Sequence, residues 1–232
     1  MSSRPTQRTA SAASHSNRFR DNLLPYITSP TSFPPSVVIH HNPSFVWIRD
    51  KYPKSYIHTL IIPRDASKST LHPFDAFDDS AFLGSVRAEA QKLRSVVAKE
   101  LKRKLGEQQG RDWEREVMVG VHARPSLRHL HVHVLSREMC GEGMKKAAHY
   151  NSFRTGFFVH LDEFPLPPED ERRRRHGAKW LEGDLVCWRC GRGFGRSLVR
   201  LKEHLGEEFE EWKRAPIEDE RVVEVDEGEE TE

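Results

Sequence analysis

HLHVHVLS, residues 129–136, is the stretch that decides the fold expected for this chain. Its histidines are His129, His131 and His133, and the residues between them are apolar. Side chains alternate between the two faces of a β-strand, so the three imidazoles would share one face, roughly 6.5–7 Å apart, and the apolar side chains the other. The stretch therefore predicts a strand that packs on a hydrophobic core and presents three imidazoles to one ligand.

Three imidazoles on one strand face are compatible with more than one role. Imidazole supplies both a nucleophile and a hydrogen-bond donor near neutral pH, which suits three groups converging on a phosphate. His-x-His on a strand is also a geometry that binds zinc. A partly exposed strand with scattered histidines is the non-functional alternative. At this point the residues favour a site but leave phosphate chemistry and metal binding open.

The segments around this strand predict an α+β domain with one mainly antiparallel sheet and a long helix. Apolar residues at three- and four-residue steps predict the long helix over residues 75–105, ending at Gly106, and a short helix before Ser29 and Pro30. β-branched runs predict the strands. They are expected at residues 36–40, 45–49, 57–62, 117–121 and 130–135, with 153–160 as a further candidate.

Composition and charge narrow the class of protein. The 36% hydrophobic content is low for a compact domain, which predicts disordered ends around an ordinary middle. Residues 217–232 carry nine acids and one arginine, so removing their net charge of −8 from the chain's +2 leaves +10 on residues 1–216. A basic body suits a polyanionic partner. No stretch approaches the ~20 apolar residues of a membrane span, and three cysteines form no disulfide framework.

The C-terminal part carries a metal-binding pattern. Cys187 and Cys190 are spaced as a metal-binding pair, and His204 and Glu208 follow at a four-residue spacing that puts them on one helix face. The helical spacing favours Glu208 over the adjacent Glu207. A closed four-ligand shell predicts a structural zinc ion whose binding is coupled to folding. The arginines expected to contact phosphates nearby are Arg189, Arg192, Arg196 and Arg200.

The pattern His-φ-His-φ-His-φ-φ at 129–135 resembles the histidine-triad superfamily of nucleotidyl hydrolases and transferases. Three motifs in order narrow the resemblance to the aprataxin family. They are DKYPKSYIHTLIIP at 50–63, VHARPSLRHLHVHVLS at 121–136 and HYNSFRTGFF at 149–158. The resemblance runs from about Phe19 to Trp212. It implies an enzyme that removes AMP from 5′-adenylated DNA left by abortive ligation, and a finger whose last ligand is a carboxylate, as in fungal members.

The resemblance implies a role for each histidine of the expected site. His131 would attack the phosphate and form a covalent adenylyl-histidine, which water then hydrolyses. His129 and His133 would orient His131 and hold phosphate oxygens. His122 would protonate the departing 5′-phosphate, and His58 would be the fourth active-site histidine.

Other residues match the family's substrate-binding positions. Asp50 would bond the ribose hydroxyls, with Phe45 and Ile48 flanking the adenine. Ser126 would hydrogen-bond the leaving phosphate. Phe19 would stack on the terminal base pair of the DNA, a contact worth roughly 1–3 kcal/mol.

One position departs from the family's pattern. The family usually has a phosphate-contacting lysine directly before His149 of the third motif, whereas this chain has Ala148. Lys145 and Lys146 lie just upstream. We expect these lysines and His149 to contribute to the same substrate-binding region.

The expected organisation has four parts. A disordered arm at 1–17 precedes a catalytic domain at 18–165, which is followed by a basic helix and zinc finger at 166–214 and an acidic disordered tail at 215–232. The protein is expected to act as a monomer in the nucleus. The arm also has the composition of a mitochondrial leader, and the sequence leaves open whether it is one.

Three functions are compatible with these features. The first is removal of AMP from 5′-adenylated DNA nicks or ends, with RNA–DNA junctions and guanylylated ends as open substrates. The second is hydrolysis of small AMP conjugates or dinucleoside polyphosphates, and the third is a non-catalytic DNA-binding adaptor. The complete triad argues against the adaptor and the arginines around the finger against the small-molecule hydrolase. A separate zinc site also weakens the metal interpretation of the triad.

Overall fold

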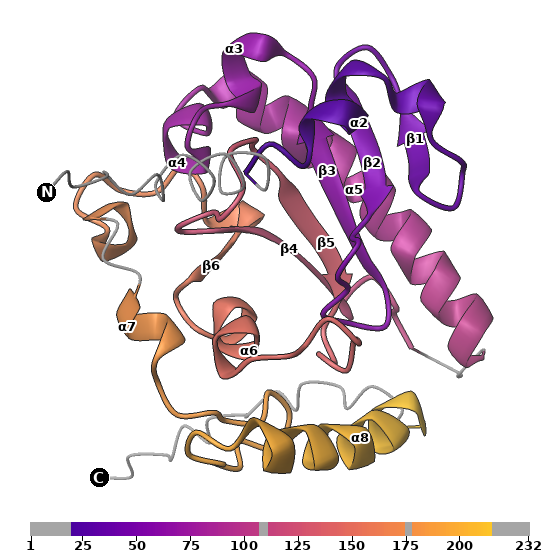
Figure 1. The fold of residues 1–232 in the computed structure, drawn as a ribbon, viewed down its shortest axis with the longest axis vertical. Helices are drawn as coiled ribbons and strands as arrows, with labels where there is room; N and C mark the ends of the chain where they lie inside the picture. Colours follow the sequence, from indigo (N-terminus) through magenta and orange to yellow (C-terminus); the bar gives the residue numbers. More distant parts are fainter. Residues whose placement is uncertain (1–19, 107–110, 175–177, 215–232) are drawn as a thin grey trace, which may run out of the picture.

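The computed structural model describes residues 20–106, 111–174 and 178–214, which build a six-stranded sheet with helices on both faces (Figure 1). The strand order is β1-β2-β3-β5-β4-β6, and each neighbouring pair is antiparallel. The predicted α+β class is confirmed. Phe19, the arm at 1–17 and the tail at 215–232 lie outside the described residues.

Five of the six strands lie within two residues of the predicted bounds. The strands are β1 Val38–His41, β2 Phe45–Arg49, β3 His58–Pro63, β4 Val117–His122, β5 Val132–Ser136 and β6 Phe158–His160. The sixth is much shorter than predicted, because the first half of the 153–160 segment belongs to a helix. That helix, α6 (Ala147–Arg154), has four successive buried residues at 150–153 and therefore no amphipathic pattern to reveal it.

The predicted turn between the first two strands is held by Asn42. Its Oδ1 accepts hydrogen bonds from the backbone N–H groups of Ser44 and Phe45, at 2.9 and 2.8 Å. Its Nδ2 donates to Glu89 on the long helix at 3.0 Å. One side chain thus closes the β1–β2 hairpin and ties it to the layer behind the sheet.

The long helix α5 (Ser80–Leu105) begins later than predicted. Oδ1 of Asp79 accepts from the backbone N–H groups of Ala81 and Phe82, which makes Asp79 the N-cap and separates α5 from the short α4 (Pro73–Ala76). The helix ends before Gly106, whose φ of 96° favours glycine. The predicted start was wrong because the apolar spacing continues across a cap that interrupts the backbone.

The two faces of the sheet are covered differently. One face packs on α5 in a single large apolar cluster. The opposite face carries two separate clusters: α2 (Leu24–Thr28) packs over β1–β3, and α6 with the C-terminal segment packs over β4 and β5. The remaining helices are α3 Ala66–Ser69, α7 Ala178–Leu181, α8 Leu198–Arg214, and 3-10 turns at Pro30–Ser32, Leu161–Glu163 and Glu171–Arg174.

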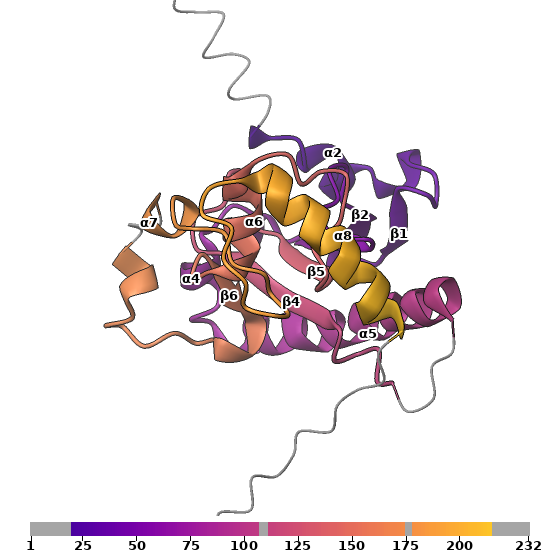
Figure 2. The same cartoon turned by 90° about the horizontal axis from the view of Figure 1, so that it is seen from below.

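The C-terminal helix α8 shares buried surface with the sheet layer. Its Leu201 and Leu205 belong to the same cluster as Leu135 of β5. Figure 2 shows α8 running across the molecule on the side of α6. Near its end, Trp212 is almost fully buried in the large α5 cluster.

The anchor at Trp212 is a cation between two indoles. The Arg111 guanidinium lies 4.1 Å from the ring centroid of Trp113 and 4.5 Å from that of Trp212. It also donates to the backbone carbonyl of Trp212, and the Trp212 Nε1 donates to Glu116 at 2.7 Å. The finger segment and the sheet are therefore joined at two places.

None of the helices in the described ranges combines the length and apolar composition that a membrane span requires.

Gly120 gives a test of how tightly the sheet is packed beneath the histidines. A Cβ at Gly120 would lie 2.4 Å from the Val159 carbonyl oxygen and 2.7 Å from the Phe158 ring, so we expect Gly120→Ala to destabilise the fold by about 1–3 kcal/mol. The same change at Gly84 in α5 meets no atom within 4 Å and should stabilise by about 0.5–1 kcal/mol. Urea unfolding of both variants measures this. Equal unfolding free energies would contradict it.

Candidate functional site

Four histidines converge on the sheet face opposite α5. His133 pairs with Leu60 of β3 and with Gly120 of β4, which puts His58 at the start of β3 and His122 at the end of β4 beside it. The His133 ring centroid lies 4.5 Å from that of His122, 5.0 Å from that of His131 and 5.2 Å from that of His58. The structure thus brings together four of the five predicted catalytic histidines.

His129 does not join this cluster through its side chain. Strand β5 begins only at Val132, because the Leu130 N–H donates to the Ser69 carbonyl instead of to a strand neighbour. The His129 imidazole lines a separate cavity of about 520 Å³ together with Leu24 and other residues of α2 and α3. The expectation that three imidazoles share one strand face was wrong for His129.

His129 nevertheless acts on the site through its backbone. Its carbonyl oxygen lies 2.7 Å from Nδ1 of His131. A carbonyl can only accept, so Nδ1 carries the proton and Nε2 of neutral His131 carries the lone pair. This is the nitrogen that a nucleophile requires.

The neighbouring pair is fixed in the same way. The backbone N–H of Lys54 donates to Nδ1 of His58 at 3.1 Å, so Nε2 of His58 is the protonated nitrogen. That Nε2 lies 2.9 Å from Nδ1 of His133 and donates to it. Nε2 of His133 is then a donor. It is buried and has no hydrogen-bond partner in the described ranges, as is also true of Nε2 of His122. Such orphaned atoms suit the oxygens of a ligand.

Burial keeps these imidazoles neutral. It lowers the pKa of His58 to about 4, and it lowers the pKa values of His122 and His133 well below their ordinary range. Burial also lowers the pKa of His131. At neutral pH, His131 therefore has a free lone pair.

Asp50 lies at the edge of the cluster, with Oδ2 3.6 Å from Nε2 of His58. Burial opposes its ionisation, but the attraction of His58 and the backbone N–H of Tyr52 outweigh burial and lower the pKa of Asp50. Asp50, His58 and His133 are close enough to hold a metal ion. However, the facing nitrogens of the two histidines are hydrogen-bonded to each other. That bond favours the phosphate interpretation over the metal interpretation.

Phe153 of α6 is a site residue that sequence reasoning missed. Its ring contacts three of the imidazoles edge-on, with centroid distances of 4.6 Å to His122, 5.2 Å to His133 and 5.6 Å to His58. The only signal was its place in the HYNSF motif, where it was assigned to a strand. It forms an apolar wall beside the histidines.

The strand alternation in β2 tests the expectation that Phe45 and Ile48 both flank the adenine. Phe45 packs in the α5 cluster and Ile48 in the α2 cluster, on opposite faces of β2, so they cannot both flank one adenine. Ile48 shares the face of the histidines. The expected role of Phe45 was wrong because alternation along the strand puts it behind the sheet.

The predicted phosphate-binding residues are spread along loops. Ser126 is exposed between β4 and β5. Lys145 and Lys146 are exposed just before α6, and Nδ1 of His149 lies 3.2 Å from the Gly143 carbonyl.

Lys54 is the lysine whose charge reaches the imidazoles. After burial and the charge of Asp50, it contributes to the lowered pKa of His58, and it acts in the same direction on His122 and His133. Lys54 belongs to the first motif, and the sequence alone indicated no role for it. Its position makes it a candidate for the phosphate contact that Ala148 lacks.

The predicted metal ligands also come together. Sγ of Cys190 lies 3.1 Å from Nε2 of His204, which lies 3.1 Å from Oε1 of Glu208, and the ligand atoms of these residues and Cys187 all lie within 4.8 Å of one another. Nδ1 of His204 faces Glu207 at 3.8 Å, which leaves Nε2 for a metal. Two thiols, an imidazole and a carboxylate in this arrangement fit a tetrahedral zinc ion.

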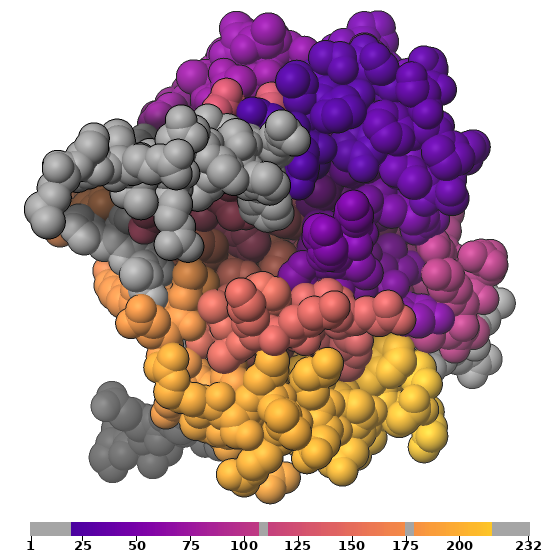
Figure 3. All heavy atoms as spheres, viewed as in Figure 1, coloured from indigo at the N-terminus to yellow at the C-terminus, as the bar shows by residue number. Residues whose placement is uncertain are grey.

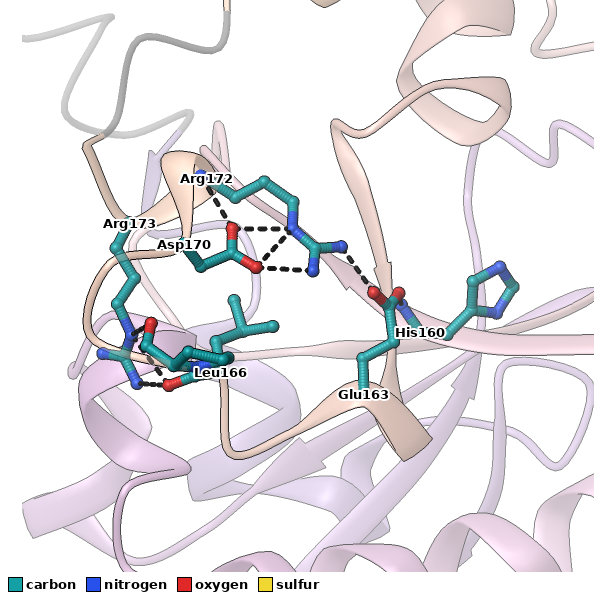
Figure 4. Close-up of polar contacts among 7 residues, drawn as sticks. His160, Glu163, Leu166, Asp170, Arg172 and Arg173 are labelled. Atoms are coloured by element: carbon teal, nitrogen blue, oxygen red, sulfur yellow. Dashed lines mark hydrogen bonds and ion pairs between the residues drawn. The ribbon is translucent and has the colours of Figure 1, made fainter.

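Arg172 and Arg173, in the connector that follows β6, are paired inside the protein. Figure 4 shows Arg172 bonded to Asp170 and Glu163. Arg173 donates to Asp78 and to the Leu166 carbonyl. These two arginines hold the connector after β6 and are not free charges for DNA.

The arginines of the zinc-finger segment have different partners within the protein. Arg189 donates to Glu208 at 2.7 Å and to Glu211 at 2.8 Å, while Arg196 donates to the Glu182 carbonyl at 2.6 Å. Arg192 lies over the Phe194 ring, 5.5 Å from its centroid. The expected phosphate contacts of these arginines and of Arg200 stay predictions.

Comparison with known proteins gives two family models that together span most of the chain. The model described as "Scavenger mRNA decapping enzyme C-term binding" matches residues 27–149, and "C2HE / C2H2 / C2HC zinc-binding finger" matches residues 154–211. The second match covers all four predicted zinc ligands.

Curated relatives and solved structures agree with each other. The chain is 34% identical over 203 residues to an aprataxin-like protein of Schizosaccharomyces pombe, covering 84% of this chain and 83% of the relative. It is 32% identical to one of Saccharomyces cerevisiae, covering 82% and 96%. A structure titled "Crystal structure of aprataxin ortholog Hnt3 in complex with DNA" superposes with a TM-score of 0.74 at 34% identity, covering 84% of this chain and 96% of the other. The chain belongs to the aprataxin family.

Proposed function

We propose that this protein is a DNA 5′-adenylate hydrolase, which releases AMP from abortively ligated DNA ends. The observation that carries the proposal is the Nε2 lone pair of His131, held beside the unpartnered Nε2 atoms of His122 and His133. A phosphate in this position would meet one nucleophile and two hydrogen-bonding groups. A solved relative whose title names a complex with DNA supports DNA as the substrate class.

The reaction proceeds in two steps. Nε2 of His131 attacks the phosphorus of the AMP group, and the bond from that phosphorus to the oxygen of the DNA 5′-phosphate breaks. The negative charge of the bound phosphates favours the imidazolium form of His122, which supplies a proton to this leaving oxygen and becomes neutral. Water then attacks the adenylyl-histidine and passes a proton back to His122, which releases AMP and regenerates His131. The His129 carbonyl holds the Nδ1 proton throughout.

The other residues stabilise charge and exclude water. His133 donates from Nε2 to a non-bridging oxygen, an arrangement that costs no reorganisation because His58 has already fixed its tautomer. Asp50 binds the ribose hydroxyls, and Ser126 binds the departing phosphate. Phe153 shields the imidazoles from solvent.

The C-terminal segment binds one zinc ion through Cys187, Cys190, His204 and Glu208. Zinc supplies a structural cross-link there and takes no part in the chemistry. Three anionic ligands give the site a net charge of about −1, which the contact from Arg189 to Glu208 offsets. The arginines of this segment bind DNA phosphates without reading sequence. DNA as the substrate agrees with action in the nucleus.

His131→Ala tests the proposed nucleophile. We expect AMP release from a 5′-adenylated nicked duplex to fall by at least about 1,000-fold, because the change removes the nitrogen that attacks the phosphate. His129→Ala is the matched control, since it keeps the carbonyl that orients His131 and should lose less than about tenfold. A gel assay of AMP release measures both. Near-normal turnover by His131→Ala would contradict the covalent mechanism. If the wild-type protein turns over only small AMP conjugates, the small-molecule alternative is favoured.

Metal analysis tests the finger. We expect one zinc ion per chain, lost in Cys187→Ser and retained in Glu208→His, because a second imidazole on the same helix face completes the shell. Glu207→Gln is the control and should keep zinc, since Glu207 lies on the far side of His204. Loss of zinc in Glu207→Gln but not in Glu208→Ala would show that Glu207, and not Glu208, is the fourth ligand.

The buried histidines predict how stability depends on pH. The pKa of His58 is about 4 in the folded protein, against an ordinary value near 6.5 in the unfolded chain. Below pH 6.5 the unfolded chain therefore binds a proton that folded His58 excludes, so the free energy of unfolding should fall as the pH drops from about 6.5 to 4. Urea unfolding at several pH values measures this. His58→Gln should flatten the dependence, and an unchanged slope would show that His58 is not buried as a neutral group.

A further inference from the structure

Two loops beside the histidines are in direct backbone contact. The Gly141 N–H donates to the Lys54 carbonyl at 2.9 Å, and the Gly143 N–H donates to the Pro53 carbonyl at 2.7 Å. A Cβ at Gly141 would lie 2.4 Å from the Pro53 carbonyl oxygen, and a Cβ at Gly143 would lie 2.3 Å from that of Tyr52. Only residues without a side chain permit this approach.

Side chains reinforce the same contact. The carboxylate of Glu138 accepts from the Tyr56 N–H, and Oγ of Ser136 accepts from the Ile57 N–H at 3.1 Å. Oγ of Ser55 donates to Sδ of Met139 at 3.8 Å. The segment 138–144 therefore contacts residues 52–56 one after another, and Ser136 at the end of β5 continues the contact to Ile57.

Lys54 links this contact between the two loops to the active site. Its carbonyl is held by Gly141, while its N–H donates to Nδ1 of His58. His58 in turn donates to His133. The backbone position of Lys54 thus decides which nitrogen of His58 is protonated, and through it which nitrogen of His133 can donate to a ligand.

The segment 138–144 also contacts the finger helix. Sγ of Cys140 lies 3.3 Å from the carbonyl of Leu205, one residue after His204, and 3.4 Å from the carbonyl of Glu138, so its S–H can donate to either. Met139 and Met144 are fully buried in the cluster that contains Leu205. Figure 3 shows the segment around these residues as a band between the C-terminal helix below it and the loop of the first motif above it.

We infer that residues 138–144 are a positioning segment, which fixes the tautomers of His58 and His133 and couples them to helix α8. The inference rests on the proposed function for its kinetic consequence, but its structural content concerns the imidazoles alone. If the segment shifts, His58 loses the N–H that fixes it, and a fraction of His133 turns its donor away from the ligand. The imidazoles take part in the chemical step, so its rate falls by more than substrate binding does, even though Lys54 moves with them.

Gly141→Ala in the full-length, zinc-loaded protein tests the inference, with Gly84→Ala as the matched addition of one methyl group. The first readout is the ¹⁵N chemical shifts of the His58 and His133 imidazoles, which report tautomers directly. We expect Gly141→Ala to convert the fixed tautomers into mixtures, and Gly84→Ala to leave them unchanged. The second readout is kcat and KM on a 5′-adenylated nicked duplex. We expect kcat to fall at least about tenfold in Gly141→Ala, by a larger factor than any rise in KM.

A second pair of variants tests the coupling to α8 and serves if Gly141→Ala does not fold. Cys140→Ala removes the donor to Leu205, whereas Cys140→Ser keeps a hydroxyl that can donate. Cys140→Ala should perturb the same imidazole shifts and lower kcat by about threefold or more, and Cys140→Ser should restore both.

The outcomes are separable. Unchanged imidazole shifts in both Gly141→Ala and Cys140→Ala overturn the positioning role, and so does an equal change in Gly84→Ala. A loss of zinc or of folding equal to the loss of activity assigns the segment to stability alone. If the wild-type protein does not act on adenylated DNA, the proposed function fails, while the imidazole shifts still decide whether the segment positions His58.

Discussion

The hydrogen bond between His58 and His133 is the interaction on which the rest of the site depends. Two neutral imidazoles can share one hydrogen bond only if one donates and the other accepts. Protonating His133 would set two donors face to face in this pair, and protonating Nδ1 of His58 would set it against the Lys54 N–H. Burial maintains neutrality by lowering both pKa values. Once the pair is fixed, the outer nitrogen of His133 has a single role, and the site is organised before any ligand arrives.

The burial of this pair depends on the different coverage of the two faces of the sheet. Helix α5 closes one face completely, while the other face is covered by the α2 cluster over β1–β3 and by the α6 and α8 cluster over β4 and β5. The histidines occur on this second face, with Phe153 as an apolar wall. A continuous layer would bury the imidazoles without access, and an absent layer would let water raise their pKa values towards 6.5. The division of the helices thus accompanies the burial that keeps the imidazoles neutral.

Local patterns predicted much of this arrangement, and long-range contacts were hidden from them. β-branched runs marked the strands, and the spacing of His204 and Glu208 marked the metal ligands, because both depend on neighbours a few residues away. The displacement of His129 depends on a hydrogen bond from Leu130 to Ser69, sixty residues earlier in the chain. Helix α6 was not predicted because most of its sides are buried, so its sequence lacks the periodic spacing of apolar residues. The hydrogen bond from Gly141 to Lys54 likewise cannot be predicted from the sequence of either segment alone.

The guanidinium of Arg111 between Trp113 and Trp212 also bears on how such a chain can change over evolutionary time. A finger attached only by a linker could be replaced by recombination with any other DNA-binding module. Here the last helix of the finger contributes an indole to a buried sandwich whose other two members come from the sheet domain. An exchanged module would leave a buried cation without one of its partners, which is costly. The two parts are therefore constrained to be inherited together, and substitutions at the three positions should arise in concert.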